Sequence, residues 1–441
     1  MKNKKILICL SILLCLLIFL TTTSFADNTE ITTYSPYCIL MEASSGKIIY
    51  EKNSNTPVPP ASTTKIMTAI LTLENCNLTD TATVSHEAIF TVPVGYSHAY
   101  LVEGEVLTIE QLLYILLIPS ANDAANVLAE HIAGSVSSFT TMMNTKALEL
   151  GCKNTNFVNA NGIQNENHYT TAYDLALMGR YAMQNETFRK IVSTTKYTLP
   201  STNKYAEANR YFKLTNELIL PDDRDAVDNY YYSYATGIKT GYTAAAGECI
   251  VASAEKDGIE YIVVILGAEK TENGLSGRYL DCKNLFNYAF ENYKTYTINE
   301  ENSKLKEVKI SKASYFNNKL DLIVQDEITL LLKKDTNVSN ITPTVEITSD
   351  LVAPITKNSV IGTITYNIDG NEYTSNLLAS SDIAVSDTST TILITGSILL
   401  AIYLLFRLLK LNNSKKKKRR KKKKGTNTNV RKRNKDSFLY W

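Results

Sequence analysis

The sequence has few residues of the kinds that build disulfide frameworks or metal centres. Seven cysteines occur in 441 residues, and Cys9 and Cys15 lie in an apolar N-terminal stretch. The other five are an odd number, and they are scattered through apolar contexts: Cys38, Cys76, Cys152, Cys249 and Cys282. This pattern does not indicate a disulfide framework, and no spacing is typical of a metal site. We therefore expect buried free cysteines, no bound metal and no cofactor.

Histidine is also scarce, and its few positions lack catalytic partners. The four histidines are His86, His98, His131 and His168. None belongs to a recognisable Ser-His-Asp pattern, so a hydrolase of that type is disfavoured. No internal repeat is evident.

The N-terminus has the three parts of a secretory signal peptide. A basic start at Met1–Lys5 precedes an apolar run from Ile6 to Leu20, and Ser24-Phe25-Ala26 forms a small-x-small site. This order predicts export and cleavage after Ala26. An uncleaved N-terminal anchor is the alternative. No cysteine stands at the cleavage site, so a lipoprotein anchor is disfavoured.

The C-terminal region predicts a single membrane span. Residues 391–406 are uncharged and mostly apolar, and the stretch extends to Leu409 if Arg407 reaches the interface. An unbroken run of ten basic residues follows at 415–424. Positive charge beside a span stays in the cytoplasm. We therefore expect a cell-membrane protein with an extracellular body and a basic cytoplasmic tail.

The net charge of +2 conceals two regions of opposite sign. Residues 27–406 hold 27 Lys and Arg against 43 Asp and Glu, a net charge of −16. Such a body should not bind nucleic acid, whereas a cationic substrate or an ion-rich wall would suit it. The basic tail adjoins a span, so attraction to anionic lipid is the better interpretation of its charge.

Composition and patterning divide the chain into six parts. They are a signal peptide (1–26), an enzymatic domain (27–297), a small β-rich domain (298–380), a linker (381–390), a transmembrane helix (391–409) and a basic tail (410–441). The apolar segment at 391–409 is followed directly by the basic tail at 410–441.

The larger domain opens and closes with strands and has helices in its middle. Strand patterns occur at 37–41, 47–50, 235–241, 250–254 and 259–266, and helical periodicity at 109–117, 122–132, 137–150, 172–183 and 278–293. Asp257-Gly258 marks a hairpin. The first and last segments must then pair in one antiparallel sheet, which is an α+β arrangement.

Three short motifs carry the candidate chemistry. Ser62-Thr63-Thr64-Lys65 begins a predicted helix, where positions i and i+3 share a face, so a buried Lys65 amine can take the Ser62 proton. Ser120-Ala121-Asn122 lies on a predicted turn between helices. Lys239-Thr240-Gly241 lies on a strand, where glycine clears the face for a docking substrate.

Each motif alone has an ordinary structural explanation. Ser62 is also a good helix cap, Ser120 and Asn122 favour helix ends, and Lys239 protects an edge strand. Together and in this order, they form the signature of penicillin-binding proteins and class A β-lactamases.

Residues 32–295 resemble the low-molecular-mass penicillin-binding proteins, the serine-type D-alanyl-D-alanine carboxypeptidases. The likeness extends over Pro60–Ala69, Ser120–Ala125 and Gly237–Thr243 with Gly247. It implies a transpeptidase-like domain of antiparallel sheet and helices, followed by a small all-β domain and a C-terminal anchor. The substrates would be peptidoglycan stem peptides, and β-lactam antibiotics would be covalent inhibitors.

The resemblance also implies a role for each candidate residue. Ser62 would be the acylated nucleophile and Lys65 its general base, with Ser120 and Asn122 relaying a proton and holding the substrate amide. The substrate-binding residues would be Lys239, Thr240, Gly241, Tyr242 and Arg278. Backbone N–H groups of Ser62 and Tyr242 would form the oxyanion hole.

Some positions depart from the family pattern. Asn159-Ala160-Asn161-Gly162 stands where relatives often carry Pro-His before the glycine, so no histidine is assigned there. The C-terminal anchor resembles a true span, whereas relatives often have an amphipathic helix. No Glu-x-x-Leu-Asn occurs between Ser120 and Lys239, which disfavours a class A β-lactamase. A D,D-endopeptidase and an inactive wall-binding scaffold are the remaining alternatives.

Overall fold

The computed structural model describes six stretches of the chain. They are residues 31–221, 229–314, 316–347, 350–368, 370–386 and 388–433. The predicted signal peptide (1–26) and the last part of the predicted tail (434–441) lie outside the described residues. The chain divides into two compact units, residues 1–294 and 295–441.

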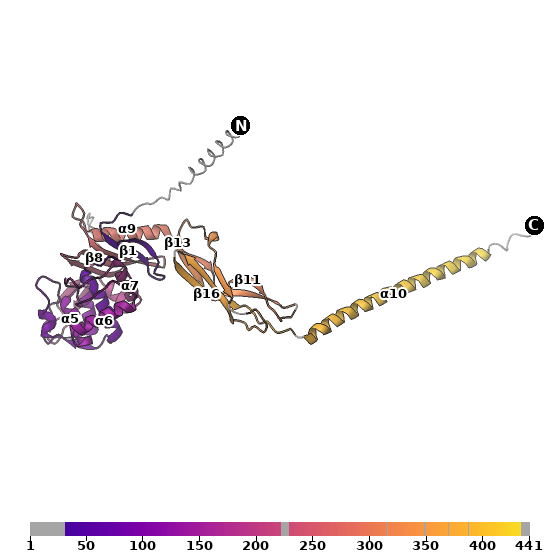
Figure 1. The fold of residues 1–441 in the computed structure, drawn as a ribbon, viewed down its shortest axis with the longest axis horizontal. Coiled ribbons are helices and arrows are strands. Elements are labelled where there is room, and N and C mark those ends of the chain that lie inside the picture. The colour runs from indigo at the N-terminus through magenta and orange to yellow at the C-terminus, as the bar shows by residue number, and fades with distance from the viewer. Residues whose placement is uncertain are drawn as a thin grey trace, which may run out of the picture. The chain divides into compact units, whose positions relative to one another are not determined.

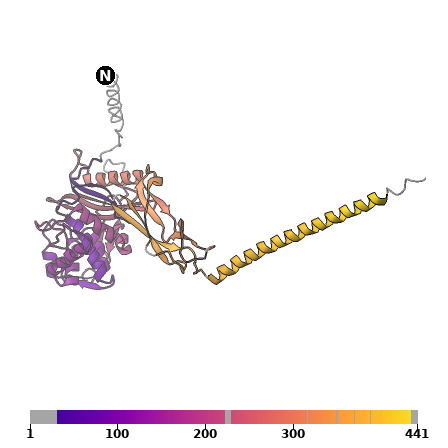
Figure 2. The same cartoon turned by 45° about the vertical axis from the view of Figure 1, so that its right-hand side comes forward.

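The first unit is built around a five-stranded antiparallel sheet in the order β2-β1-β9-β8-β7 (Figures 1 and 2). Its strands are β1 (Tyr37–Glu42), β2 (Ile48–Lys52), β7 (Ala235–Thr243), β8 (Gly247–Lys256) and β9 (Ile259–Ala268). The first strands of the domain therefore pair with its last ones, which confirms the α+β prediction. β7 lies at one edge of the sheet.

Helices cover both faces of this sheet (Figure 1). The helices and one 3-10 turn are η1 (Ala61–Thr64), α2 (Lys65–Asn75), α3 (His86–Phe90), α4 (Ile109–Leu117), α5 (Asn122–Ala133), α6 (Val136–Glu149), α7 (Ala172–Ala182), α8 (Glu186–Val192) and α9 (Gly277–Asn292). α9 packs on one face of the sheet, against β8 and β9, and α7 packs on the other face, against β1 and β9.

Alternation along the strands explains this three-layer arrangement. In β9, Ile262, Val264 and Leu266 belong to the core shared with the main helical layer. Tyr261, Val263 and Ile265 alternate with them and are equally buried. Successive side chains of a strand point to opposite faces, so a strand apolar at every position is suited to a sheet covered on both sides.

Short elements complete the first unit, and the sequence patterns did not predict them. Two small antiparallel ribbons pair β3 (Thr81–Thr83) with β4 (Val106–Thr108), and β5 (Lys196–Leu199) with β6 (Arg210–Lys213). α3 and α8 were also missed. Helices of five and seven residues are too short to show a clear period.

The second unit is an all-β body followed by one long helix. Its strands are β10 (Tyr293–Asn299), β11 (Lys304–Lys309), β12 (Lys319–Val324), β13 (Ile328–Lys333), β14 (Thr344–Ile347), β15 (Val360–Ile368) and β16 (Asn371–Ala379), with a short 3-10 turn η2 (Val338–Asn340). β10 pairs with β13, and the others form one sheet in the order β11-β12-β16-β15-β14. Leu322, Leu330, Ile364 and Leu377 are fully buried in its core.

Helix α10 (Thr388–Arg433) continues past the predicted span and through the basic run. Its segment Ile392–Arg419 is the one candidate span among the described residues that is long and apolar enough to cross a membrane. The apolar side chains of this segment are exposed, for example Leu399 and Phe406. A helix whose apolar side chains lack protein contacts is suited to lipid surroundings.

Candidate active site

The candidate nucleophile lies on a tight 3-10 turn rather than within an α-helix. Ser62 belongs to η1, and Lys65 is the first residue of α2. Side chains at i and i+3 eclipse in a 3-10 turn, which brings the Lys65 Nζ to 2.9 Å from the Ser62 Oγ. The sequence expectation that Lys65 reaches Ser62 is met by this tighter geometry. Ala61, directly before Ser62, has a left-handed φ of 49°.

Lys65 is fully buried, and its amine has three neighbours at hydrogen-bond distance. Besides Ser62, these are the Asn122 Oδ1 at 2.7 Å and the Asn161 backbone carbonyl at 2.6 Å. Both oxygens only accept hydrogen bonds. A neutral amine has two N–H donors and one lone pair, so it can satisfy both oxygens and still accept the Ser62 proton.

The surroundings of Lys65 favour this neutral form. Burial is the largest cause that lowers the pKa of Lys65 well below its ordinary value, and the nearby charge of Lys239 lowers it further. Asp123 opposes these effects, because a negative charge favours the ammonium. The balance shifts the amine toward the neutral form that a general base requires.

The second motif lies between α4 and α5. Ser120 has a left-handed φ of 66°, and Asn122 is the first residue of α5. The Asn122 backbone N–H donates to the Ser97 carbonyl at 2.9 Å, which connects this turn to the loop between α3 and β4. The Ser120 Oγ is buried and has no hydrogen-bond partner among the described residues. An unsatisfied buried hydroxyl is costly, and it is ready to bond an incoming group.

The third motif lies on the edge strand β7. A Cβ added to Gly241 would lie 3.0 Å from the Ser62 nitrogen, so the strand packs directly against η1, the turn that carries the candidate nucleophile Ser62. The Thr240 Oγ1 lies 2.6 Å from the Thr215 Oγ1. Glycine at position 241 thus permits the close approach of η1, which a side chain would obstruct, whereas the sequence argument assigned the cleared face to a docking substrate.

Lys239 lies beneath the cleft rather than in its lining. Its side chain is 1% exposed, and its Nζ donates to the Thr240 carbonyl at 2.8 Å. Burial, and then the charge of Arg278, lower the pKa of Lys239 to about 7. The charge of Lys239 therefore acts on the site from below and depends on pH near neutrality.

Arg278 approaches the same edge from the start of α9. Its Nη1 donates to the Gly241 carbonyl at 3.2 Å, and its guanidinium lies 4.8 Å from the Tyr279 ring centroid. The Arg278 Nε has no hydrogen-bond partner among the described residues. The guanidinium keeps donor capacity next to β7, where an anionic group is best received.

A cleft of about 420 Å³ brings these elements together. Its lining consists of Ser62, Gly95, Tyr96, Ser97, Ser120, Asn122, Thr215, Thr240, Gly241, Tyr242, Thr243, Ala244 and Arg278. Every candidate residue from the sequence is at this cleft or, for Lys65 and Lys239, buried next to it. Sequence reasoning missed Tyr96, Ser97 and Thr215 in the lining and the Asn161 carbonyl on Lys65.

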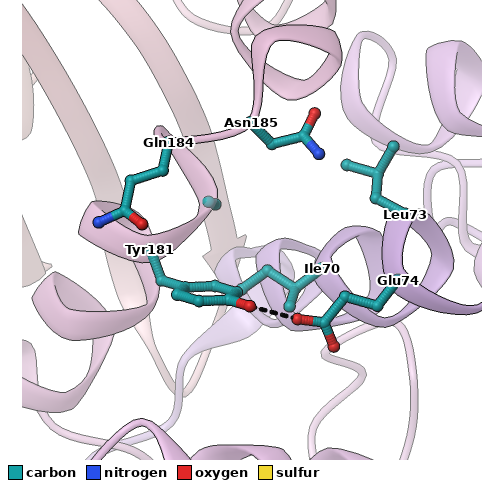
Figure 3. Close-up of a pocket in the computed structure, with 7 residues that line it drawn as sticks. Ile70, Leu73, Glu74, Tyr181, Gln184 and Asn185 are labelled. Atoms are coloured by element: carbon teal, nitrogen blue, oxygen red, sulfur yellow. Dashed lines mark hydrogen bonds between the residues drawn. The ribbon is translucent and has the colours of Figure 1, made fainter.

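A second pocket, of about 230 Å³, lies at the other end of α2 (Figure 3). The Tyr181 hydroxyl donates to Glu74 across it at 2.5 Å, and Lys146 pairs with Glu74 at 2.7 Å. It contains none of the motif residues. The candidate residues therefore gather at the cleft near the N-terminal end of α2 and not at this pocket.

Comparison with known proteins assigns the chain to a family. The family model described as D-alanyl-D-alanine carboxypeptidase, Peptidase S11, matches residues 23–270. The chain belongs to this family. A second model, described as the penicillin-binding protein 5 C-terminal domain, matches residues 293–385.

Similar proteins cover most of the chain. D-alanyl-D-alanine carboxypeptidase DacF of Bacillus subtilis is 32% identical over 82% of this chain and 87% of its own length. Penicillin binding protein 5 from Haemophilus influenzae has 27% identity and a TM-score of 0.63, covering 81% of this chain and 99% of that structure. The Streptomyces K15 DD-transpeptidase has 34% identity and a TM-score of 0.53, over 60% of this chain and 99% of that structure.

Proposed function

We propose that this family member is a serine-type carboxypeptidase that removes the terminal D-Ala from peptidoglycan stem pentapeptides. The observation that carries the proposal is the environment of Lys65. Its buried amine lies 2.9 Å from the Ser62 Oγ, and two obligate acceptors occupy its other positions. This is the arrangement that a general base needs to activate a serine.

In the acylation step, Lys65 removes the proton from the Ser62 hydroxyl as Oγ bonds the carbonyl carbon of the penultimate D-Ala. The backbone N–H groups of Ser62 and Tyr242 receive the developing oxyanion. Collapse breaks the C–N bond, and the amine of the terminal D-Ala leaves with the proton that Lys65 took up. The unpartnered Ser120 hydroxyl lies in the lining and suits the transfer of that proton.

Deacylation repeats these steps with water as the nucleophile. Lys65 takes a proton from water as its oxygen bonds the acyl carbon, and the Ser62 oxygen leaves and regains a proton. The products are a shortened stem peptide and a free enzyme. Asn122 would hold the substrate amide and, through its Oδ1, keeps the Lys65 amine in place throughout.

The substrate would lie along the free edge of β7, as an added strand. Thr240, Gly241 and Tyr242 line this edge, and Lys239 supplies positive charge from below. Arg278 would bind the terminal carboxylate, because a guanidinium is the group best suited to a planar anion. These cations offset the negative charge of the exported body.

The alternatives are weaker. A class A β-lactamase needs a glutamate to activate deacylating water, and the sequence lacks the corresponding motif. An inactive scaffold need not keep Ser62, Lys65 and Lys239 together. An endopeptidase would not require the cation pair near the end of β7. β-Lactam antibiotics are expected to acylate Ser62 and leave slowly.

The proposed location is the outer face of the cell membrane. Residues 391–409 would span the bilayer once, with the catalytic domain outside and the basic tail in the cytoplasm. The exposed Lys415–Arg419 side chains would lie near anionic lipid head groups.

Mass spectrometry of a purified 27–385 fragment tests the proposal. After mixing with penicillin, we expect a stable adduct on the peptide containing Ser62. After mixing with a stem peptide ending in D-Ala-D-Ala, we expect a product one residue shorter and free D-Ala. Absence of both results would contradict the proposal, and cleavage of the penicillin without accumulation of an adduct would favour a β-lactamase.

A further inference from the structure

A chain of hydrogen bonds runs behind the nucleophile turn. The Val158 backbone N–H donates to the His168 Nδ1 at 3.1 Å. The His168 Nε2 lies 2.8 Å from the Thr64 Oγ1, and the Thr64 hydroxyl donates to the Ala61 carbonyl at 2.8 Å. His168 is 2% exposed and Thr64 is fully buried. The part of the chain from His168 through Thr64 to Ala61 is therefore shielded from water.

The direction of every bond in this chain follows from its ends. A backbone N–H only donates, so the His168 Nδ1 is an acceptor and the ring proton is on Nε2. The Ala61 carbonyl only accepts, so the Thr64 hydroxyl donates to it and accepts from His168. Burial, and then the charge of Lys65, lower the pKa of His168 to about 4, which keeps the ring neutral at neutral pH.

The chain ends on the peptide unit that carries the Ser62 N–H. The Ala61 carbonyl and the Ser62 N–H belong to one planar peptide group and point in opposite directions. A hydrogen bond to that carbonyl therefore fixes the direction of the N–H and polarises it, because hydrogen bonds in series strengthen one another. Under the proposed function, this N–H is one of the two oxyanion donors.

Gly162 supports the same peptide unit from another side. A Cβ on Gly162 would lie 1.9 Å from the Ala61 oxygen and 2.9 Å from the Ser62 nitrogen. The loop that carries Gly162 also accepts a hydrogen bond from Thr68, through the Ala160 carbonyl at 2.6 Å. The Ala61–Ser62 peptide thus has a fixed support beneath its plane and a hydrogen bond on its oxygen.

We infer that Thr64 and His168 are positioning residues that orient and polarise the Ser62 N–H for the oxyanion. Thr64 and His168 are both absent from the lining of the cleft in the described part of the chain. Each therefore acts through the peptide group rather than on the substrate. The inference rests on the proposed function, since it assigns a use to the oxyanion hole of the same reaction.

The first test compares Thr64→Val, which removes the hydroxyl at constant volume, with Thr64→Ser, which keeps it. The full-length protein in detergent is reacted with a penicillin. The acylation rate constant should fall on the order of tenfold or more in Thr64→Val, with little change in the preceding binding constant. Thr64→Ser should restore most of the rate.

A matched control is the neighbouring Thr63. It is as buried as Thr64, and its hydroxyl donates to the Pro60 carbonyl at 2.7 Å, one peptide group earlier. Thr63→Val removes a similar bond from a peptide that does not carry the Ser62 N–H. It should lower the melting temperature about as much as Thr64→Val and leave the acylation rate close to that of the wild type.

The infrared carbonyl stretch of the acyl-enzyme measures the oxyanion hole directly. A ¹³C-labelled acyl carbonyl should shift to higher frequency in Thr64→Val and His168→Leu than in the wild type, because its hydrogen bonds are weaker. Thr64→Ser and His168→Gln, which keep a donor or acceptor at the same place, should move it back.

The outcomes separate this inference from the proposed function. If the wild type forms no penicillin adduct, the proposed function fails. If the wild type is acylated and folded Thr64→Val has both the wild-type rate and the wild-type carbonyl frequency, the positioning role is wrong. Equal loss of rate in Thr63→Val and Thr64→Val would also overturn it, since the effect would then be one of general stability.

Discussion

Gly162 packs so closely on Ala61 that a methyl group on Gly162 would lie 1.9 Å from the Ala61 carbonyl oxygen. The loop before α7 and the turn η1 that carries Ser62 are thus in backbone contact. Gly162 also has a left-handed φ of 88°. This position requires glycine for two independent reasons, conformation and space.

Gly162→Ala should therefore cost more than the backbone conformation alone explains. Gly134 provides the control, because its φ is 75° and an added Cβ there has no atom within 4 Å. Gly134→Ala should destabilise by about 1–2 kcal/mol, the ordinary cost of this conformation. Gly162→Ala should lower the melting temperature further than Gly134→Ala and should also slow penicillin acylation. If the two variants changed the melting temperature and the acylation rate equally, the close contact of Gly162 with Ala61 would be contradicted.

Ser62→Ala should abolish covalent labelling by fluorescent penicillin, because the Oγ that forms the ester is missing. The circular dichroism spectrum should be unchanged, since Ser62 is on the cleft surface. Ser44→Ala, at an exposed serine in the β1–β2 turn, should label like the wild type. Labelling of the Ser62→Ala protein on any other serine would remove Ser62 from its assigned role.

The rate of acylation should rise with pH as Lys65 loses its proton. The base works only above its own pKa, which burial and Lys239 hold below the ordinary lysine value. Lys239→Met removes the neighbouring charge, so the acid limb of the pH profile should move to higher pH. The effect should be largest below pH 7, where Lys239 is charged because its pKa is about 7.

Stopped-flow labelling with penicillin across a pH series measures this limb. Lys190→Met, at an exposed lysine of α8, serves as the control and should leave the limb unmoved. If the acid limb of the Lys239→Met profile stays at the wild-type pH, or moves to lower pH, then Lys239 does not control the proton affinity of Lys65.

Arg278→Ala should weaken recognition of the substrate carboxylate. For peptides ending in D-Ala-D-Ala, kcat/KM should fall by about tenfold or more, the usual loss for one charge-assisted contact. The wild type should cleave an amidated peptide poorly, and the mutant should be nearly indifferent to amidation. Lys283→Ala on the same helix should retain wild-type discrimination, and equal discrimination by Arg278→Ala would place carboxylate recognition elsewhere.

Ending the chain at residue 385 should release an active soluble enzyme. All three motifs lie upstream, and the apolar segment Ile392–Arg419 is removed. After cell fractionation, the truncated protein should be in the soluble fraction and should hydrolyse small stem peptides at the full-length rate. Pelleting with membranes would reveal a second tether, and loss of activity with an intact fold would give the C-terminal region a catalytic role.

The candidate site residues could be selected from the sequence because the chemistry expected of them depends on residue type and short spacing. Ser62 and Lys65 are three positions apart, and both an α-helix and the observed 3-10 turn bring such a pair together. The hairpin between β8 and β9 was equally predictable, because an Asp-Gly pair favours a turn with positive φ at both residues. In the structure, Asp257 and Gly258 both have this left-handed φ.

The missed contacts involve groups that residue type does not reveal. Lys65 donates to the backbone carbonyl of Asn161, an atom that every residue possesses. Only the glycine at 162 signalled that this loop approaches other backbone. The sequence shows no catalytic partner constellation for His168, and in the structure its partners are a threonine hydroxyl and a backbone N–H.

The free thiols have a consequence for how the protein must be handled. Cys38, Cys152, Cys249 and Cys282 are buried and unpaired, and Cys76 is partly buried. In the folded protein, burial raises the pKa of Cys38 to about 11 and that of Cys249 to about 11, so these sulfurs resist oxidation. Unfolding removes this protection from all five at once. In air, a denatured chain should form non-native disulfides between these cysteines. Recovery of activity after denaturation should therefore depend on a reductant.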